Sequence, residues 1–154
     1  MSHQTDLLEQ AVALRDLDPR RPKQANLRRA ISAAYYAVFH QLIEDAVALL
    51  LPARLAELRV QVGRKFVHST MKKVAQAAAK LQNGNLATVG SAFIVLQEAR
   101  HQADYDFSRS FTKSEATEYI ERAREAMRHW ETARTTTEGE KCMVELLLNR
   151  LDPA

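Results

Sequence analysis

The densest group of reactive side chains in the chain lies in the stretch EARHQADYDF, residues 98–107. Arg100 and Asp104 stand four positions apart, as do His101 and Tyr105, so each pair shares one face of a helix. In one interpretation, Arg100 holds a phosphate while His101, Asp104 or Tyr105 handles protons. In the other, Arg100 and Asp104 form an ion pair that helps a helix to end. The sequence leaves both open.

A second group lies in the stretch LRRAISAAYYAVFHQLIEDA. Arg29, Tyr36 and His40 recur there at helical spacing, so they line one face beside the apolar positions of the same helix. The small residues Ala33 and Ala37 would let another helix approach closely. We expect this face to bind a ligand or partner, or to form an ordinary contact between helices or between two copies of the chain.

Other common chemistries have no motif in the sequence. It contains no glycine-rich phosphate loop, no paired cysteines at metal spacing and no His-Glu-x-x-His motif. His40 and Glu44 stand four positions apart, and His68 and His101 lie elsewhere, so a metal site could form only in three dimensions. We therefore expect neither a metal nor a cofactor.

Apolar residues at spacings of three and four predict that helices position these groups. The chain has four Gly and four Pro, and none of either lies between Gly90 and Gly139, which favours long helices. Pro52 marks a break, and Thr112 with Glu115 has the spacing of a capping box at a helix start. The expected helices cover about residues 3–17, 23–50, 53–63, 67–81, 86–105 and 113–130, followed by a short helix or tail over 138–154.

Length and composition indicate one globular domain over residues 1–154. Hydrophobic residues make up 46% of the chain and charged residues 27%, as in soluble proteins with a real core. The predicted fold is an all-α bundle of four to five main helices. The apolar stripes that run from Leu27 to Leu49 and from Val67 to Leu81 predict part of its core.

Basic residues gather near the start of the second helix. The whole chain carries 22 Lys and Arg against 19 Asp and Glu, a net charge of +3. Residues 15–29 hold six of these basic residues and two of the acidic ones, a local balance of +4. Such a patch could meet phosphates, or it could be a solvated loop and helix start.

The N-terminal residues MSHQTDLLEQ lack the basic start and apolar run of a signal peptide. The longest apolar run, AVALLLPA, is far shorter than the roughly 20 residues that a membrane-spanning helix needs. The single cysteine, Cys142, cannot form a disulfide within the chain. We therefore expect a cytoplasmic protein without a membrane partner.

Three pieces of the sequence, taken together, resemble the HEPN superfamily and in particular its small prokaryotic members. They are RRAISAAYYAVFH, the histidine His68 in KFVHSTM before a helix, and ARHQADYD followed by SFTKSEATEYIERA. The match covers about residues 20–135, which would form the core of a single HEPN-like domain.

This resemblance implies an up-and-down bundle that forms a homodimer and is linked to RNA cleavage or nucleotide binding. It also implies a small nucleotidyltransferase partner in a toxin–antitoxin or defence system. In the active RNases of the superfamily, an Arg is followed after four to six residues by a catalytic His. Arg100 takes the Arg position, but Tyr105 stands at the His position. A tyrosine, with a pKa of ~10, exchanges protons poorly near neutral pH.

Three functions therefore compete. The first is a non-catalytic HEPN-like module that dimerises and binds a nucleotide, an RNA or a partner protein. Its expected binding residues are Arg29, Tyr36, His40, His68 and Arg100. The second is a metal-independent endoribonuclease toxin that uses Arg100 with the proton-transfer candidates of residues 98–107. The third is an unrelated helical scaffold or interaction protein, in which Arg100 lies far from the face that carries Tyr36.

Overall fold

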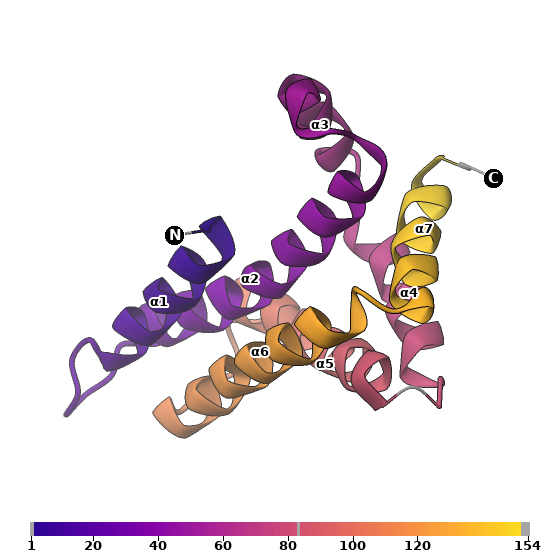
Figure 1. The fold of residues 1–154 in the computed structure, drawn as a ribbon. Coiled ribbons are helices and arrows are strands. Elements are labelled where there is room, and N and C mark those ends of the chain that lie inside the picture. Colours follow the sequence, from indigo (N-terminus) through magenta and orange to yellow (C-terminus); the bar gives the residue numbers. More distant parts are fainter. Residues whose placement is uncertain (1, 83, 152–154) are drawn as a thin grey trace.

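In a computed structural model, the described residues, 2–82 and 84–151, form seven α-helices and a 3₁₀ turn, without a strand (Figure 1). This confirms the predicted all-α class. Side chains are described as far as Leu148. The elements are α1 (His3–Asp16), α2 (Gln24–Leu50), η1 (Ala53–Leu55), α3 (Ala56–Gly63), α4 (His68–Ala79), α5 (Gly84–Tyr105), α6 (Lys113–Ala133) and α7 (Thr137–Leu151).

The helices begin and end close to the predicted positions. At the start of α6 the Thr112 side chain accepts from the Glu115 backbone N–H at 3.1 Å, and Glu115 accepts from the Thr112 N–H at 2.8 Å. The predicted capping box is therefore confirmed. The short segments predicted after Pro52 and over residues 138–154 are also helical and form α3 and α7, which gives seven α-helices among the described residues. Residues 152–154 of the predicted tail lie outside the described residues.

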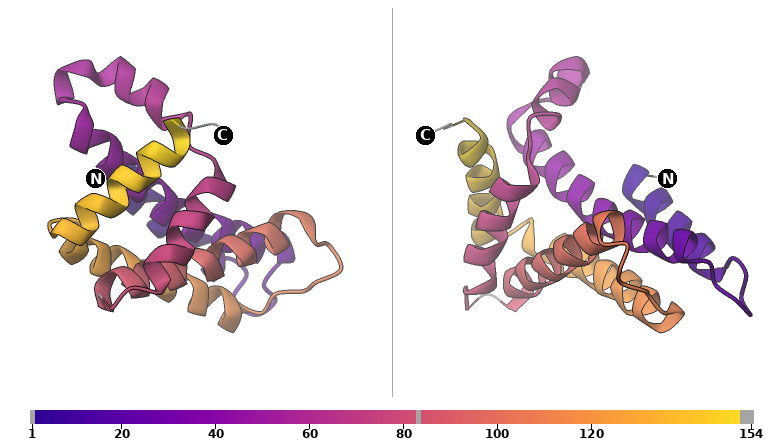
Figure 2. Two further views of the ribbon diagram at one scale, coloured as in Figure 1. Left: turned by 90° about the vertical axis from the view of Figure 1, so that its right-hand side faces the viewer. Right: turned by 180° about the vertical axis from the view of Figure 1, so that it is seen from behind.

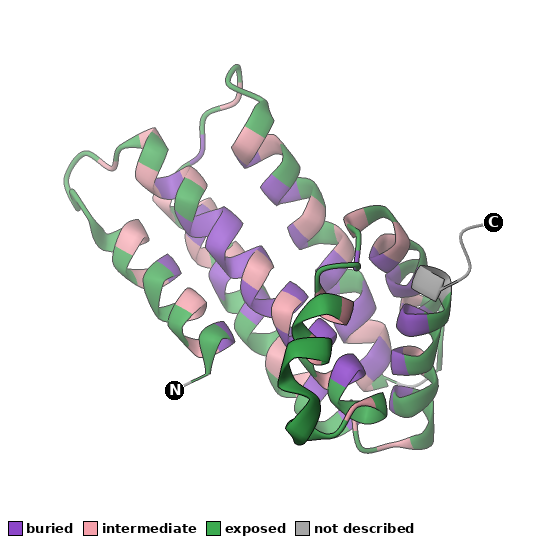
Figure 3. Cartoon of the chain, turned by 90° about the horizontal axis from the view of Figure 1, so that it is seen from above, coloured by how far each residue is buried: buried purple, intermediate pink, exposed green. Residues whose placement is uncertain are grey.

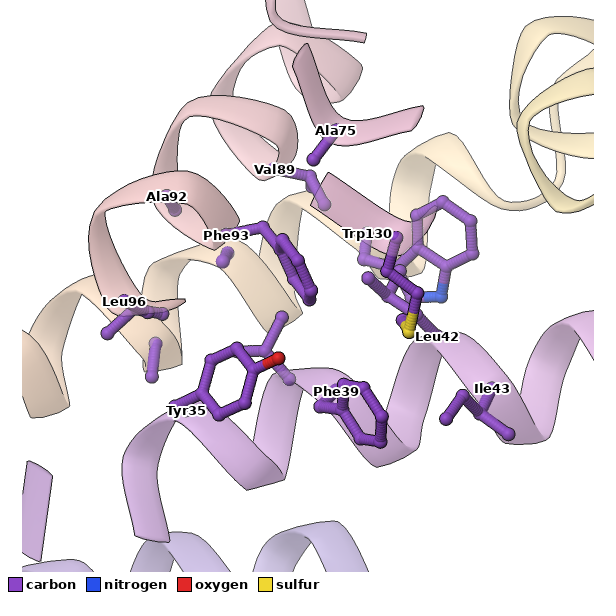
Figure 4. Packing of buried hydrophobic residues seen from close by; sticks show 14 of the residues in the cluster. Tyr35, Phe39, Leu42, Ile43, Ala75, Val89, Ala92, Phe93, Leu96 and Trp130 are labelled. Carbon is purple, nitrogen blue, oxygen red and sulfur yellow. The ribbon is translucent and has the colours of Figure 1, made fainter. Parts of the chain in front are cut away.

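The helix α2 is central to the bundle, because α1, α5, α6 and α7 all pack against it (Figure 2). Tyr35 and Phe39 of α2 meet Phe93 of α5 and Trp130 of α6 in the core (Figure 4). The buried indole of Trp130 donates to Asp45 Oδ2 at 2.7 Å. Buried residues gather where helices face one another, as the apolar spacing predicts (Figure 3).

Three residues of the predicted core are exposed instead. Leu49 is 40% exposed, Val67 42% and Leu81 47%. Leu49 lies in the last turn of α2, and the other two lie just outside the ends of α4. At these positions the apolar stripe runs past the body of the bundle, so no neighbouring helix covers it.

The short helix α3 projects beyond the end of α2 (Figures 1 and 2). It packs mainly against α2 and contains no buried residue. Among the described helices, none is by itself long and apolar enough to cross a membrane. Gln24–Leu50 and Ala53–Gly63, which meet at a bend of 119°, pass that test of length and composition only together.

The helices α4 and α5 lie very close together at Gly90. A Cβ atom added there would come within 2.5 Å of the Ala75 carbonyl oxygen and 2.7 Å of the Ala79 nitrogen. Only a glycine leaves room for the α4 backbone at this point. This close approach fixes the position of α4, which begins at His68.

Candidate functional site

Arg100 is buried, which is rare for an arginine. Only 7% of the residue is exposed, and its guanidinium carbon lies 5.3 Å from the ring centre of Tyr35 and 6.0 Å from that of Tyr36. Arg100 makes no hydrogen bond with any described residue, and its buried Nε has no partner. Buried polar groups are normally hydrogen-bonded, so these unused donors set Arg100 apart.

Asp104 lies one helical turn after Arg100 and forms the predicted ion pair with it. The distance from Asp104 Oδ2 to the nearer guanidinium nitrogen is 3.6 Å, which is too long for a hydrogen bond. The same oxygen accepts from the Ser32 hydroxyl at 3.4 Å. Asp104 thus compensates the charge of Arg100 without occupying its donors.

His68 reaches the same place from α4. Its Nδ1 lies 2.6 Å from the hydroxyl oxygen of Tyr35, and its backbone carbonyl accepts from Gln97 Nε2 at 2.9 Å. The imidazole centre is 5.6 Å from the Tyr35 ring and 6.0 Å from the Tyr36 ring. Arg100 and His68 therefore pack against the same two tyrosines.

The surroundings fix the protonation of His68 and Tyr35. Burial lowers the pKa of His68 below its usual value, and the charge of Arg100 lowers it further, while Asp104 partly offsets both. Burial raises the pKa of Tyr35 far above its usual value. At neutral pH the imidazole is uncharged and the hydroxyl keeps its proton. The buried Tyr35 hydroxyl has no other acceptor among the described residues, so it donates to Nδ1 and His68 carries its hydrogen on Nε2.

The start of α4 adds positive potential beside these residues. The residue before the helix, Val67, makes no side-chain hydrogen bond to the first turn. The first N–H groups of α4 are therefore uncapped, and a helix N-terminus carries a partial positive charge. His68 is the first residue of this turn. Donors from α4 and α5 thus converge beside the two tyrosines.

His40 extends the cluster toward α1. Its ring stacks on Tyr36 with a centroid distance of 5.9 Å, and it meets the ring of His3 at 5.1 Å. Burial lowers the pKa of His40, and His3 adds to that effect. Four of the five expected binding residues therefore lie together. The scaffold alternative predicts that Arg29, Tyr36, His40 and Arg100 do not converge, and of these four only Arg29 lies apart. The residues brought together are Tyr36, His40, His68 and Arg100.

The other candidates lie apart from this cluster. Arg29 is exposed and has no ion pair or hydrogen bond with a described residue. His101 and Tyr105 contact each other with a ring distance of 5.1 Å, on the exposed side of α5. Tyr105 is 64% exposed. Of the residues proposed for proton transfer, only the side chain of Asp104 lies beside the Arg100 guanidinium.

Arg28 has a structural role that the sequence did not show. Its guanidinium donates to the backbone carbonyls at the end of α5 and in the loop after it. The acceptors are Gln102 at 3.2 Å, Ala103 at 2.9 Å, Asp106 at 2.9 Å and, in addition, Arg109. A helix leaves its last carbonyls unpaired, and a cation from another helix satisfies them here.

Much of the basic patch of residues 15–29 is used inside the chain. Arg15 pairs with Asp16 at 2.9 Å, and Lys23 lies 3.8 Å from Asp18. With Arg28 bound to carbonyls, this patch offers fewer free cations than its local charge implies. The solvated-loop interpretation fits these contacts better than a phosphate-binding patch does.

The small residues of α2 are covered by the chain itself. Ala33 is 8% exposed and Ala37 is fully buried. They allow close packing within the bundle and leave no surface there for a second copy. The expected homodimer therefore rests on the HEPN resemblance alone. Among the described residues, no three His, Cys, Asp or Glu side chains are close enough together to hold a metal ion.

Comparison of the chain with protein-family models, with curated proteins and with solved structures gives no match. The resemblance to HEPN proteins therefore rests on the sequence motifs alone.

Proposed function

We propose that the chain is a HEPN-like, up-and-down helical module that binds the phosphate group of a nucleotide or an RNA without cleaving it. The binding site is the Arg100 cluster, which consists of Tyr35, Tyr36, His68, Arg100 and Asp104. The buried guanidinium of Arg100, whose donors have no acceptor among the described residues, carries the proposal. A phosphate presents oxygen acceptors in the geometry that a guanidinium fork matches.

The groups around Arg100 suit a phosphate better than a neutral ligand. The uncapped start of α4 and the Nε2–H of His68 add donors beside the two tyrosines that Arg100 also contacts. Tyr36 is only partly buried, so its ring can also contact a nucleobase. The ligand class that combines a phosphate with a flat ring is a nucleotide, free or within an RNA.

Binding without cleavage follows from the proton-transfer groups. Cleavage needs a general base with a pKa near the working pH. The residue at the histidine position of the HEPN motif, Tyr105, is 64% exposed and contacts His101 on the exposed side of α5. His68 has its Nδ1 engaged by Tyr35 and acts as a donor at neutral pH.

Further parts of the proposal come from the HEPN resemblance. They are a homodimer, a small nucleotidyltransferase partner and a place in a toxin–antitoxin or defence system. Size-exclusion chromatography with light scattering tests the first of them. A strict monomer at micromolar concentration would remove the homodimer and leave the phosphate site untouched.

Isothermal titration calorimetry with ADP and with a short single-stranded oligoribonucleotide tests the site. The variants are Arg100→Met, which removes the donors, and Arg100→Lys, which keeps a charge but not the fork. We expect each to weaken binding at least about tenfold. Arg122→Met, on the exposed face of α6, is the control and should bind as the wild type does. Absence of binding in the wild type, or equal binding by Arg100→Met, would overturn the proposal.

A metal-independent endoribonuclease is the second candidate, and one observation favours it. The structure brings an arginine and a histidine together, as in the catalytic pair of HEPN RNases, because Arg100 and His68 pack against the rings of Tyr35 and Tyr36. The two residues lie in different helices and form no motif in the sequence. Incubation with mixed RNA separates the two functions. Cleavage that disappears in both Arg100→Met and His68→Gln would replace the non-catalytic proposal with this one.

A further inference from the structure

A groove lies between the C-terminal half of α2 and the projecting helix α3. Its volume is about 740 Å³, and most of the side chains that line it are apolar. Phe39, Ile43 and Val47 contribute from α2, Val60 from α3, and Phe66 from the segment before α4. This volume is typical of a binding groove. His40 and His68, which lie beside Arg100, also line it, so the groove adjoins the proposed phosphate site.

The apolar surface continues past the groove over the corner where α2 turns into α3. Val60 is 52% exposed, and four leucines near it are also exposed. Because α3 has no buried residue, the chain itself leaves this surface uncovered. Clustered exposed apolar residues mark interaction surfaces. The leucines are Leu49 at 40%, Leu50 at 58%, Leu55 at 39% and Leu58 at 41%.

Most of the charged residues beside the groove are positive. Residues 51–67 hold four basic residues and one acidic residue, a balance of +3. Of the two carboxylates that line the groove, Asp45 forms an ion pair with Arg134 at 3.3 Å, whereas Glu44 accepts only from the neutral amide of Gln4 at 2.6 Å and keeps its negative charge. None of the four basic residues forms an ion pair with a described residue, and the side chains of three of them also make no hydrogen bond with one. These are Arg54, Arg64 and Lys65.

We propose that this groove binds an acidic amphipathic helix of a partner protein. The apolar face of the helix would lie on Val60 and the α2 side of the groove, and its carboxylates would meet Arg54, Arg64 and Lys65. Helix-in-groove recognition uses such a pairing of apolar anchors with rim charges. The proposal goes beyond phosphate binding and does not depend on it.

Two other occupants fit the surface less well. A second copy that used the same surface would bring the same unpaired cations together, which repel. A bilayer would reach the corner leucines but leave the groove empty, whereas a helix of about 10 Å diameter enters a groove. Shape and charge together therefore favour an acidic helix.

Fluorescence anisotropy with two synthetic peptides tests the proposal. Each has about 18 residues with Leu at positions i, i+3, i+4 and i+7, and Glu fills the polar positions of one and Lys those of the other. We expect the Glu peptide to bind and the Lys peptide not to. Val60→Asp and Arg64→Glu should each weaken binding at least about tenfold. Val144→Asp, at a valine that is 38% exposed outside the groove, should not.

Three results would overturn the proposal. The first is no binding of the Glu peptide by the wild type, or equal binding of both peptides. The second is sedimentation with phosphatidylserine vesicles that Val60→Asp abolishes, without peptide binding, which would assign the surface to a bilayer. The third is self-association that Val60→Asp abolishes, which would assign it to a second copy. ADP titration of the same variants keeps this test separate from the phosphate site, because none of them touches Arg100.

Discussion

Arg28 of α2 and Arg100 of α5 both lie near the C-terminal end of α5, but they differ in their hydrogen bonds. Arg28 donates to four backbone carbonyls and lies 5.4 Å from the rings of Phe107 and Phe111. Arg100 also lies against two aromatic rings, yet it makes no hydrogen bond with a described residue. Each guanidinium lies against two aromatic rings, so the two arginines differ in whether hydrogen-bond acceptors surround them.

This difference predicts a structural role for Arg28 and a ligand-binding role for Arg100. The guanidinium of Arg28 satisfies carbonyls that the helix end leaves free, so its removal would cost stability. The guanidinium of Arg100 lies 3.6 Å from Asp104 but donates to no acceptor among the described residues, so its donors are available to a ligand. Removing each side chain should therefore affect different properties, stability for Arg28 and binding for Arg100.

Replacing Arg28 with Met should give the largest loss of stability. Four carbonyls at the end of α5 and in the loop after it would lose the Arg28 donor, and two of them, those of Ala103 and Arg109, have no other donor outside the helix ladder among the described residues. We expect the free energy of unfolding to fall by about 3 kcal/mol. Urea denaturation measures this loss. The neighbouring Arg29→Met is the control, because Arg29 is exposed, and should leave stability unchanged. A loss of stability below about 1 kcal/mol for Arg28→Met would contradict the structural role of Arg28.

Replacing Gly90 with Ala should cost about 2 kcal/mol, because the new methyl group meets backbone atoms of α4. The shift of α4 should also move His68 away from Arg100 and weaken ADP binding. Thermal unfolding and calorimetry on the same sample measure both effects. Gly84→Ala, where nothing lies within 4 Å of the added atom, is the matched control. Full stability in Gly90→Ala would show that α4 is not fixed in this way.

Lowering the pH to mildly acidic values should cause a smaller loss of stability. This loss should come from His40 and His68, which lie beside Arg100. The pKa values of His40 and His68 lie below their usual value of 6.5 in the folded chain. The unfolded chain therefore takes up protons first, so stability is complete above about pH 6.5 and declines as the pH falls below it. Urea denaturation between about pH 7 and 5.5 should show this decline. His40→Gln and His68→Gln should each flatten it, and an unchanged slope would contradict the assigned burial.

Replacing Arg100 with Met should change stability least, by less than about 1 kcal/mol. An apolar side chain of similar length can replace a poorly bonded buried cation without loss. Urea denaturation beside Arg28→Met gives the comparison directly. If both variants lose stability equally, then Arg100 is a structural residue like Arg28.

The sequence predicted the features that depend on residues close together in the chain. The apolar spacing predicted the helices, and the pairs Thr112–Glu115 and Arg100–Asp104 were found as expected, because each lies within one helical turn. The sequence also placed Leu49 in the core, where it is exposed, because periodicity does not show where a neighbouring helix ends.

What the sequence could not predict depends on packing between distant segments. Tyr35 and His68 are 33 positions apart, and Arg28 and Gln102 are 74 apart. No local spacing indicates such contacts. His68 could be proposed as a candidate only from the HEPN resemblance, and its contact with the rings that hold Arg100 depends on how α4 packs.

The most direct test of the central claim is the Nε–H signal of Arg100 in nuclear magnetic resonance of the ¹⁵N-arginine-labelled protein. The signal is assigned as the one that is missing in Arg100→Met. On titration with ADP, we predict that it shifts to saturation while the Nε–H signal of Arg28 stays in place. An Arg100 signal that does not move at saturating ADP would contradict the claim that its unpaired donors form a phosphate-binding site.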